Sequence, residues 1–254
     1  MENVEILGNK VTLIEPLELN NEIKRIVSHK QKQLILNTNI YGINLANQQE
    51  WLREFRNSSH IVFCDGEGVI MGAKILGIKI PQRIPLTEWL WDLCSFCEKN
   101  KLSIFFLGTT QEILNRAKTN ILRVYPNLLI KGIHHGFFNK EGKENDEVVE
   151  LINKNKPDIL VVSFGMPLQE KWLNENWKKL DARVFLVGGA CFDYASGCLK
   201  RGPKILTDNG FEWFCRLIIE PKRLWRRYLI GNLIFFYNIL KTFVRARFIS
   251  FLNI

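Results

Sequence analysis

Arginine and aromatic side chains alternate in one short segment near the C-terminal end of this chain. Residues 220–228 read Glu-Pro-Lys-Arg-Leu-Trp-Arg-Arg-Tyr, Arg216 precedes them, and an aliphatic and aromatic tail follows directly. A guanidinium group presents a planar fork of donors that matches the oxygens of a phosphate or diphosphate. A basic and apolar tail is typical of segments that bind an anionic membrane surface. Together these residues predict a polyanionic substrate that is handled at a membrane.

A single carboxylate is the second feature that could do chemistry. Asp65 directly follows the apolar run Ile61–Cys64, where it could act as a general base at the end of a strand. A turn aspartate is the alternative, because Asp-Gly is a common turn dipeptide. Asp65 and Glu67 also have the outline of a pair that binds a divalent metal, but no other acidic cluster accompanies them. We therefore expect a catalytic Asp65, no metal site and no cofactor.

The basic charge of the chain is concentrated in one region. Of the net charge of +9, a charge of +7 comes from Arg216 onward, where eight lysines and arginines face one acid. Such a concentration concerns one surface, and a merely solvated basic face is the alternative. We expect no nucleic-acid partner, because the tail is too apolar and no RNA-binding or helix-turn-helix signature is present.

Targeting signals and cysteine usage favour the cytosol. No signal peptide is expected in residues 1–16, and the longest apolar stretch, residues 229–240, falls short of the roughly 20 residues that cross a bilayer. The six cysteines show no secreted framework. Cys94 and Cys97 form a C-x-x-C pair in an expected helix, which is either half of a zinc site or, as we favour, two buried thiols.

Short apolar runs alternate with helical patterns along most of the chain. The runs are continuous and rich in β-branched and aromatic residues, as in strands covered on both faces. Their alternation predicts an α/β fold, with a Rossmann-like, mostly parallel sheet flanked by helices. The expected strands are Gln33–Leu36, Ile61–Cys64, Ser103–Leu107, Leu128–Gly132, Asp158–Ser163 and Val184–Val187. The expected helices include Gln48–Asn57, Trp89–Asn100, Thr110–Tyr125, Asp146–Lys154 and Gln169–Leu180.

Polar and glycine residues follow the expected strands. Because ligands of such sheets bind beyond the carboxyl ends of the strands, we expect these residues to form one functional rim. The rim comprises Asn37, Asn39, Asp65, Gly108, Gly165 and Gly188. The composition becomes basic and aromatic near Lys200, which predicts a Rossmann-like core of residues 1–199 and a basic helical appendage of residues 200–254.

The tail has the pattern of a helix that lies in a membrane interface. Asn238, Lys241 and Arg245 form a polar stripe along it. The apolar residues that are expected to point elsewhere are Leu233, Phe236, Leu240, Phe243 and Val244. Arg216 and Arg223 are seven residues apart, so we expect them on one helical face. The alternative for the tail is a helix buried in the core or in a homo-oligomer.

Motifs along nearly the whole chain, from about Val4 to Tyr228, resemble those of the WecG/TagA/CpsF family of bacterial glycosyltransferases. Each motif is weak alone, but together they stand in the family's order. They are Asn39, Asp65-Gly66, Arg83, Leu107-Gly108, Gly136-Phe137-Phe138, Pro157-Asp158, Gly165-x-Pro167-x-Gln169-Glu170, Gly188-Gly189, Phe192-Asp193, Gly197, Arg201-x-Pro203, Glu212-Trp213, Arg216-Leu217, Glu220-Pro221-x-Arg223 and Arg227-Tyr228.

The resemblance implies an inverting transferase that moves a sugar from a UDP-sugar to a polyprenyl-diphosphate-linked sugar acceptor. It implies peripheral attachment to the inner, cytoplasmic face of the bacterial plasma membrane, and a role in cell-surface polysaccharide or teichoic acid synthesis. The family member best understood mechanistically transfers N-acetylmannosamine to a GlcNAc-diphospho-lipid. The basic appendage is implied to bind the membrane and to complete the site.

Matching positions give the candidate site residues. By the resemblance, Asp65 is the general base, Asn39, Arg83 and Gln169 are pocket residues, and Arg216, Arg223 and Arg226 are the appendage arginines. Asn37, Gly108 and Asp193 complete the expected substrate-binding set. Many members carry Thr at the position of Asn37. The family usually has Ala at the position of Gly202 and a glycine two or three residues after the position of Arg83. These departures leave the donor sugar open.

The expected chemistry needs no metal. Glycosyl transfer from a UDP-sugar expels a diphosphate, and preorganised cations can stabilise its growing negative charge. The arginines are the obvious cations, so we expect metal-independent transfer. The alternative from another functional class is a non-catalytic peripheral membrane scaffold that keeps this fold, which an assay of donor hydrolysis or transfer would separate from the enzyme.

Overall fold

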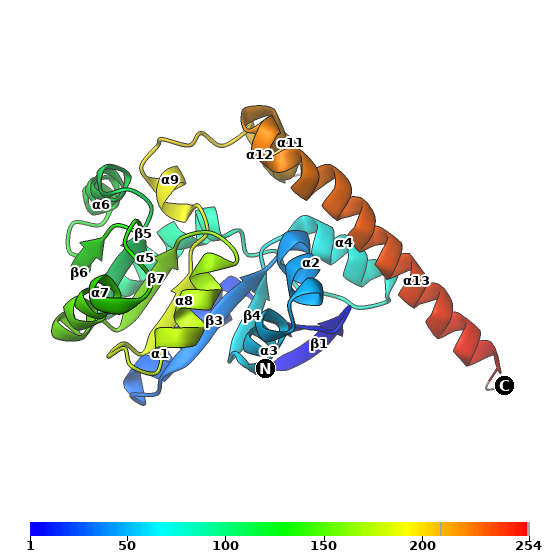
Figure 1. The fold of residues 1–254 in the computed structure, drawn as a ribbon, viewed down its shortest axis with the longest axis horizontal. Helices are drawn as coiled ribbons and strands as arrows, with labels where there is room; N and C mark the ends of the chain where they lie inside the picture. Colours follow the sequence, from blue (N-terminus) through cyan, green and yellow to red (C-terminus); the bar gives the residue numbers. More distant parts are fainter. Residues whose placement is uncertain (209, 253–254) are drawn as a thin grey trace.

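A six-stranded parallel sheet forms the centre of the computed structural model, which describes residues 1–208 and 210–252 (Figure 1). Its strand order is β4-β3-β8-β7-β5-β6. The strands are β3 (Gln33–Thr38), β4 (Ile61–Cys64), β5 (Ser103–Gly108), β6 (Leu129–His134), β7 (Ile159–Ser163) and β8 (Val184–Val187). The predicted α/β fold is confirmed, and each predicted strand matches an observed one to within two residues at either end.

Helices cover both faces of the sheet. One face is covered by α1 (Pro16–Ser28), α5 (Leu86–Asn100), α6 (Gln111–Val124) and α9 (Cys191–Ala195), and the other by α3 (Glu50–Ser58), α7 (Gly142–Asn155) and α8 (Leu168–Asn176). Successive strand residues point to opposite faces, so Phe106 enters the first core and Phe105 the second. Both faces are therefore buried, which explains why the strands are continuously apolar.

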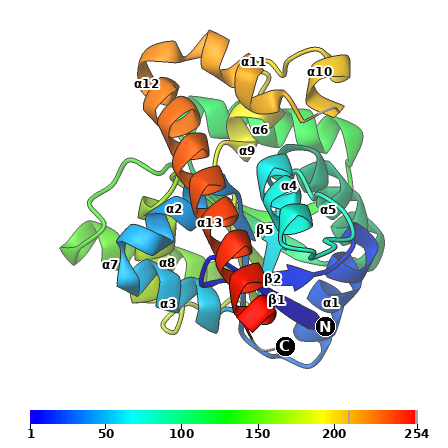
Figure 2. The ribbon, with the colours of Figure 1, turned by 90° about the vertical axis from the view of Figure 1, so that its right-hand side faces the viewer.

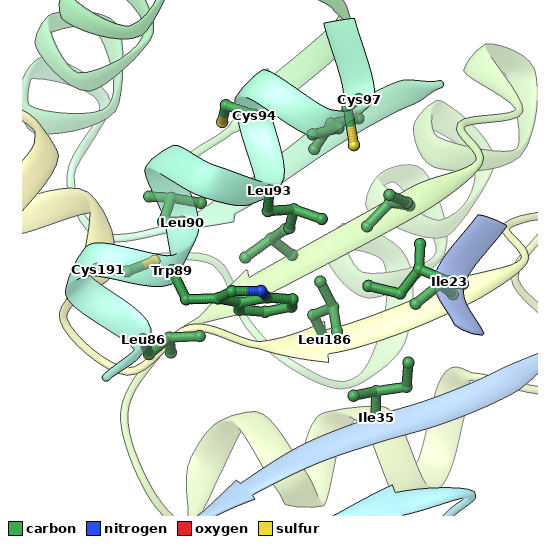
Figure 3. Close-up of a cluster of buried hydrophobic side chains, with 14 of the residues drawn as sticks. Ile23, Ile35, Leu86, Trp89, Leu90, Leu93, Cys94, Cys97, Leu186 and Cys191 are labelled. Carbon is green, nitrogen blue, oxygen red and sulfur yellow. The ribbon is translucent and has the colours of Figure 1, made fainter. Parts of the chain in front are cut away.

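The core under α5 contains the two cysteines of the C-x-x-C pair. Figure 3 shows Cys94 and Cys97 on α5, about one and two turns beyond Trp89 and Leu90, which lie over the sheet. Both thiols are buried, and burial raises the pKa of Cys94 to about 12. They are packed as apolar groups in the first core.

Several elements were not expected from the sequence. The expected helix Gln48–Asn57 corresponds to α3, which begins only at Glu50 because Gln49 has an extended backbone with φ −132° and ψ 102°. The preceding helix α2 (Ile40–Gln48) was not expected. The first residues form an antiparallel hairpin of β1 (Glu2–Ile6) and β2 (Asn9–Leu13). Its turn residues Leu7 and Gly8 both have positive φ, as in the tight turns that favour hairpins. Helices α1 and α4 (Glu67–Ile75) were also not anticipated.

The appendage consists of α10 (Lys204–Asp208), α11 (Glu212–Ile219), α12 (Pro221–Trp225), a π-helical turn (Arg226–Ile230) and the long helix α13 (Gly231–Leu252). Figure 2 shows α13 running between α2 and α4, and it contacts both. Phe235 and Ile239 on its inner face are fully buried in a third core with the hairpin and α4. The core-packed alternative for the tail therefore holds for this one face of α13.

The outer face of α13 is apolar. Leu233, Tyr237, Leu240, Val244 and Phe248 recur every three or four residues and are all more than half exposed; we call them the exposed stripe. The predicted polar residues Asn238, Lys241 and Arg245 lie on another side, where they line a groove beside Asn47 and Arg53. Phe236 and Phe243 are partly buried. Within residues 1–208 and 210–252, no helix is long and apolar enough to cross a membrane.

Candidate active site

A cavity of about 1120 Å³, the larger cavity, lies beyond the carboxyl ends of the strands. Strands β5 and β7 are neighbours, but β5 leads to β6 on one side and β7 leads to β8 on the other. Such a reversal of direction opens a crevice where ligands of parallel sheets bind. Thr109, which follows β5, and Ser163, which ends β7, both line the larger cavity.

Many of the residues expected from the sequence line this cavity together. They are Asn37, Asn39, Asp65, Asp193, Arg216 and Arg223. Asn37 is 3% exposed, and among the described residues its Oδ1 has no hydrogen-bond donor. A buried acceptor without a partner costs free energy, and a ligand that donates to it regains that energy. Asn37 is therefore suited to accept from a hydroxyl or amide of a ligand.

A second cavity of about 340 Å³, the smaller cavity, lies between α2, α4 and the appendage. Apolar side chains contribute much of its wall, namely Ile40, Met71, Phe211, Trp213 and Phe236. The residues that line both cavities are Asn39, Asp65, Glu212, Arg216 and Arg227. Asp65 thus lies where two cavities of different character meet.

The main chain and a neighbouring amide hold Asp65 in place. Its backbone N–H donates to the Thr38 carbonyl at 2.8 Å, and the Leu86 N–H donates to Asp65 Oδ1 at 3.1 Å. Burial, followed by the negative charge of Glu212, raises the pKa of the Asp65 carboxyl above its ordinary range. The Leu86 N–H, the Asn39 side chain and Arg83 oppose that rise. A carboxylate whose pKa is raised is a stronger base than an exposed one.

Gly66 allows the Asp65 segment to approach α2. A Cβ atom at position 66 would lie 2.8 Å from the Asn39 Cβ, closer than such atoms come in proteins. Asn39 in turn caps α2, where its Oδ1 accepts from the Gly42 N–H at 3.0 Å. The Asp65-Gly66 pair therefore does more than make a turn, since the glycine brings Asp65 against a helix cap.

Cations from the appendage close the larger cavity. Arg216, Arg223 and Arg227 line it, and the chain direction breaks at Glu220 between α11 and α12. The expectation that Arg216 and Arg223 share a face of one helix is wrong, although both reach the cavity. Within the described part of the chain, the buried Nε atoms of Arg216 and Arg227 have no hydrogen-bond partner. These donors are suited to an anion.

Arg227, which was not in the expected set, occupies the place expected for Arg226. Its guanidinium lies 4.3 Å from the centre of the Tyr41 ring and borders both cavities. Arg226 is exposed and lies 5.2 Å from the Trp225 ring, away from both cavities. The i, i+4 spacing of Arg223 and Arg227 was the available signal for this arrangement.

Glu212, also absent from the expected set, joins the appendage to the core. Arg201 donates to it at 3.2 Å and also contacts Glu88 of α5. Arg83 lines only the smaller cavity, 3.9 Å from both Glu212 and Glu67. Arg83 also donates to the Thr207 carbonyl at 3.2 Å. The Glu212-Trp213 motif was the sequence signal for this link.

Two further expected residues lie outside both cavities. A Cβ at Gly108 would lie 2.3 Å from the Ser163 carbonyl oxygen, so this glycine allows β5 and β7 to approach at the rim. Gln169 is completely buried beneath the larger cavity. Across residues 1–208 and 210–252, no group of three or more His, Cys, Asp or Glu side chains is arranged to hold a metal ion.

Comparison with known proteins decides the family. Residues 4–248 match the model of the glycosyl transferase WecG/TagA/CpsF family. The chain belongs to this family. Relatives from Staphylococcus aureus strains NCTC 8325 / PS 47, COL and N315 are each 28% identical over 240 residues, covering 94% of this chain and 92% of the relative. Each of them is named N-acetylglucosaminyldiphosphoundecaprenol N-acetyl-beta-D-mannosaminyltransferase.

This WecG/TagA/CpsF glycosyltransferase has the groups that sugar transfer requires. A carboxylate at the junction of the cavities can take a proton from an attacking hydroxyl. Guanidinium groups that are already in place can stabilise charge on a departing group. Both kinds of group line the same space, so one arrangement of substrates could use them together.

Proposed function

We propose that this glycosyltransferase transfers N-acetylmannosamine or a related sugar from a UDP-sugar to a polyprenyl-diphosphate-linked sugar. The reaction would take place at the inner face of the bacterial plasma membrane, in the synthesis of a cell-surface polysaccharide or teichoic acid. The names of the Staphylococcus aureus relatives support this choice of acceptor and of transferred sugar. The UDP-sugar donor and the inverting course are what the resemblance to the family implies.

The observation that carries the proposal is the meeting of two cavities at Asp65. The larger cavity at the strand ends, which is the more polar of the two, would hold the UDP-sugar, with its diphosphate near Arg216, Arg223 and Arg227. The smaller cavity, with its apolar wall under the appendage, would hold the acceptor sugar and the start of its lipid. A hydroxyl of the acceptor would then reach the donor sugar beside Asp65.

The step is a single displacement. The acceptor oxygen forms a bond to the anomeric carbon as the bond from that carbon to the diphosphate oxygen breaks. The hydroxyl proton goes to Asp65, and UDP leaves with the electron pair of the broken bond. Attack from the side opposite the leaving group inverts the anomeric configuration. The appendage arginines stabilise the negative charge on UDP, so we propose that transfer needs no metal ion.

The surface of the appendage supports a membrane location. The exposed stripe on α13 is flanked by Lys241, Arg245 and Arg247. Apolar residues bordered by cations match the interface of an anionic bilayer. A homo-oligomer would be the other way to cover this stripe.

The test is to identify the product by mass spectrometry. A synthetic polyprenyl-diphosphate-GlcNAc is incubated with a panel of UDP-sugars, each with and without EDTA. We expect one UDP-N-acetylhexosamine to give a disaccharide-diphospho-lipid at the same rate in both arms. Activity that collapses in EDTA and returns with magnesium or manganese would contradict metal independence. If no donor gives either transfer or hydrolysis, the result would favour the non-catalytic membrane scaffold.

A further inference from the structure

A chain of buried polar side chains runs beneath the larger cavity. It comprises Asn37, Arg56, Glu170 and Gln169, none of which is more than 3% exposed. The strands β3, β8 and β7 are neighbours in the sheet, and the chain reaches the carboxyl end of each of them. Buried polar groups are costly unless they are paired, so such a chain calls for an explanation.

Gln169 makes the contacts at one end of this chain. Its Oε1 accepts from two backbone amides, those of Gly165 at 3.2 Å and Gly189 at 3.1 Å. Gly165 follows β7, Gly189 follows β8, and both line the larger cavity. Both have positive φ, a backbone conformation that glycine adopts readily. One side-chain oxygen therefore ties two turns of the cavity floor together.

Glu170 holds Gln169 in that orientation, and the buried charge of Arg56 acts on Glu170. Gln169 Nε2 donates to Glu170 Oε1 at 3.1 Å, which leaves Oε1 of Gln169 facing the glycines. Burial raises the pKa of Glu170, and the charge of Arg56 opposes that rise. Arg56 Nη2 in turn donates to the Asn37 carbonyl at 3.0 Å. Hydrogen bonds thus connect the two glycine turns to Glu170, and the charge of Arg56, which is bonded to β3, faces that carboxyl.

We propose that Gln169, held by Glu170, is a positioning residue that sets the spacing of the Gly165 and Gly189 turns and thereby the shape of the nucleotide-sugar site. The use of that site by a UDP-sugar rests on the function proposed above. Direct contact with a ligand is the alternative role for Gln169. That role would require the side chain to leave three hydrogen bonds and enter a cavity that it does not line.

The main test compares two buried amides on the same helix. Gln169→Leu removes the link between the turns, whereas Asn176→Leu removes a 2% exposed amide of α8 that bonds Asn145 and the Trp172 carbonyl instead. We expect Gln169→Leu to raise the KM for the UDP-sugar and the Kd for UDP by about 10- to 100-fold, as misplaced binding groups do. The KM for the lipid acceptor should stay unchanged. Asn176→Leu should lower the melting temperature but leave all three constants near wild type.

Amide exchange separates this role from a failure of the proposed function. In Gln169→Leu, the amide protons of Gly165 and Gly189 should exchange with solvent faster than in the wild type and in Asn176→Leu, with no ligand added. If the wild type neither binds UDP nor transfers a sugar, the proposed function fails while the exchange result still tests the positioning role. Unchanged exchange at both glycines would overturn the inference.

A double substitution that swaps the two side chains keeps the test decisive if Gln169→Leu does not fold. In Gln169→Glu/Glu170→Gln, an acceptor again faces both glycines, a donor again faces that acceptor, and Arg56 still has one carboxylate nearby. We expect UDP affinity and glycine protection close to wild type in this double variant. Gln169→Glu alone should be impaired, because two carboxylates would then adjoin. A double variant as weak as the single one would also overturn the inference.

Discussion

Arg226 and Arg227 are adjacent in the chain but face different surroundings. Arg227 borders both cavities with an unpaired buried Nε, and Arg226 lies exposed on Trp225. Arg227→Ala should therefore lower kcat by about 10²-fold or more, the usual cost of losing one donor to a developing charge. Arg226→Ala is the matched control and should stay near wild type. Equal losses in the two variants, measured by steady-state kinetics, would show that this assignment is mistaken.

Glu212 gives the site a pH dependence that can be tested. The base works when it is ionised, so kcat/KM should rise with pH through the pKa of Asp65, which burial and then Glu212 raise. Removing the negative charge in Glu212→Gln favours the Asp65 carboxylate, so this rising limb should move to lower pH. The positive charges near Asp65, Arg83 and Arg216, then act with less opposition.

Glu88→Gln serves as the control for that experiment, because Glu88 contacts Arg201 but lines neither cavity. The rising limb of its kcat/KM profile against pH should coincide with that of the wild type. A Glu212→Gln limb that stays in place or moves to higher pH would rule out this electrostatic coupling.

Some residues of this site could be predicted from the sequence and others could not. Asn37, Asn39 and Asp65 line the cavity as the position of each at or just beyond a strand end predicts. Asp193, which lies in α9 and also lines the cavity, was expected only from the family resemblance. Arg227 was missed because the family resemblance indicated Arg226, although Arg227 has the i, i+4 spacing from Arg223 that places two side chains on one helical face. The burial of Gln169 could not be foreseen, because a residue in the first turn of a helix can point either to the cavity or below it.

Among the elements, helix α13 depends on a glycine in α4. A Cβ at Gly72 would lie 2.7 Å from Phe235 Cε1 and 3.3 Å from Ile239 Cδ1. Gly72→Val should force these buried rings and chains apart and cost about 1–3 kcal/mol, as overpacking does. Urea unfolding would give the loss of stability, and limited proteolysis would show whether α13 is released. The exposed Lys74→Val on the same helix controls for helix propensity; an equal loss there would refute the packing argument.

Element prediction succeeded where burial makes a strong pattern. The six parallel strands are apolar on both faces, so their runs stand out in the sequence. Helix α2 was missed, and the start of α3 was placed two residues early because Gln is a good helix former and only the extended backbone at Gln49 marks the boundary. The hairpin of β1 and β2 was missed because its strands alternate polar and apolar residues over only five positions each.

For the whole molecule, the appendage is expected to serve two roles at different distances from Asp65. Arg216 and Arg227 reach the cavities, whereas Lys241, Arg245 and Arg247 lie further along α13. Reversing the last three charges to Glu should weaken binding to anionic vesicles by far more than tenfold, because each basic residue near such a surface contributes about 1 kcal/mol. Transfer to a short-chain soluble acceptor should continue.

Co-sedimentation with phosphatidylglycerol vesicles, run beside the soluble assay, separates the two roles. A triple variant that loses activity on the soluble acceptor while it binds vesicles as the wild type does would refute this division. Reversing Lys143, Lys171 and Lys178, which lie on α7, α8 and the turn after α8, gives a matched change of charge away from the appendage.

The central claim is that Asp65, at the meeting of the two cavities, takes the proton in sugar transfer. Asp65→Asn keeps the oxygen that accepts from the Leu86 N–H, so the local structure should persist. The decisive measurement is the kcat of this variant with the UDP-sugar and lipid acceptor identified above, beside the Kd for UDP. The account predicts a fall in kcat of about 10²- to 10⁴-fold with an unchanged Kd. Full turnover in Asp65→Asn would contradict it.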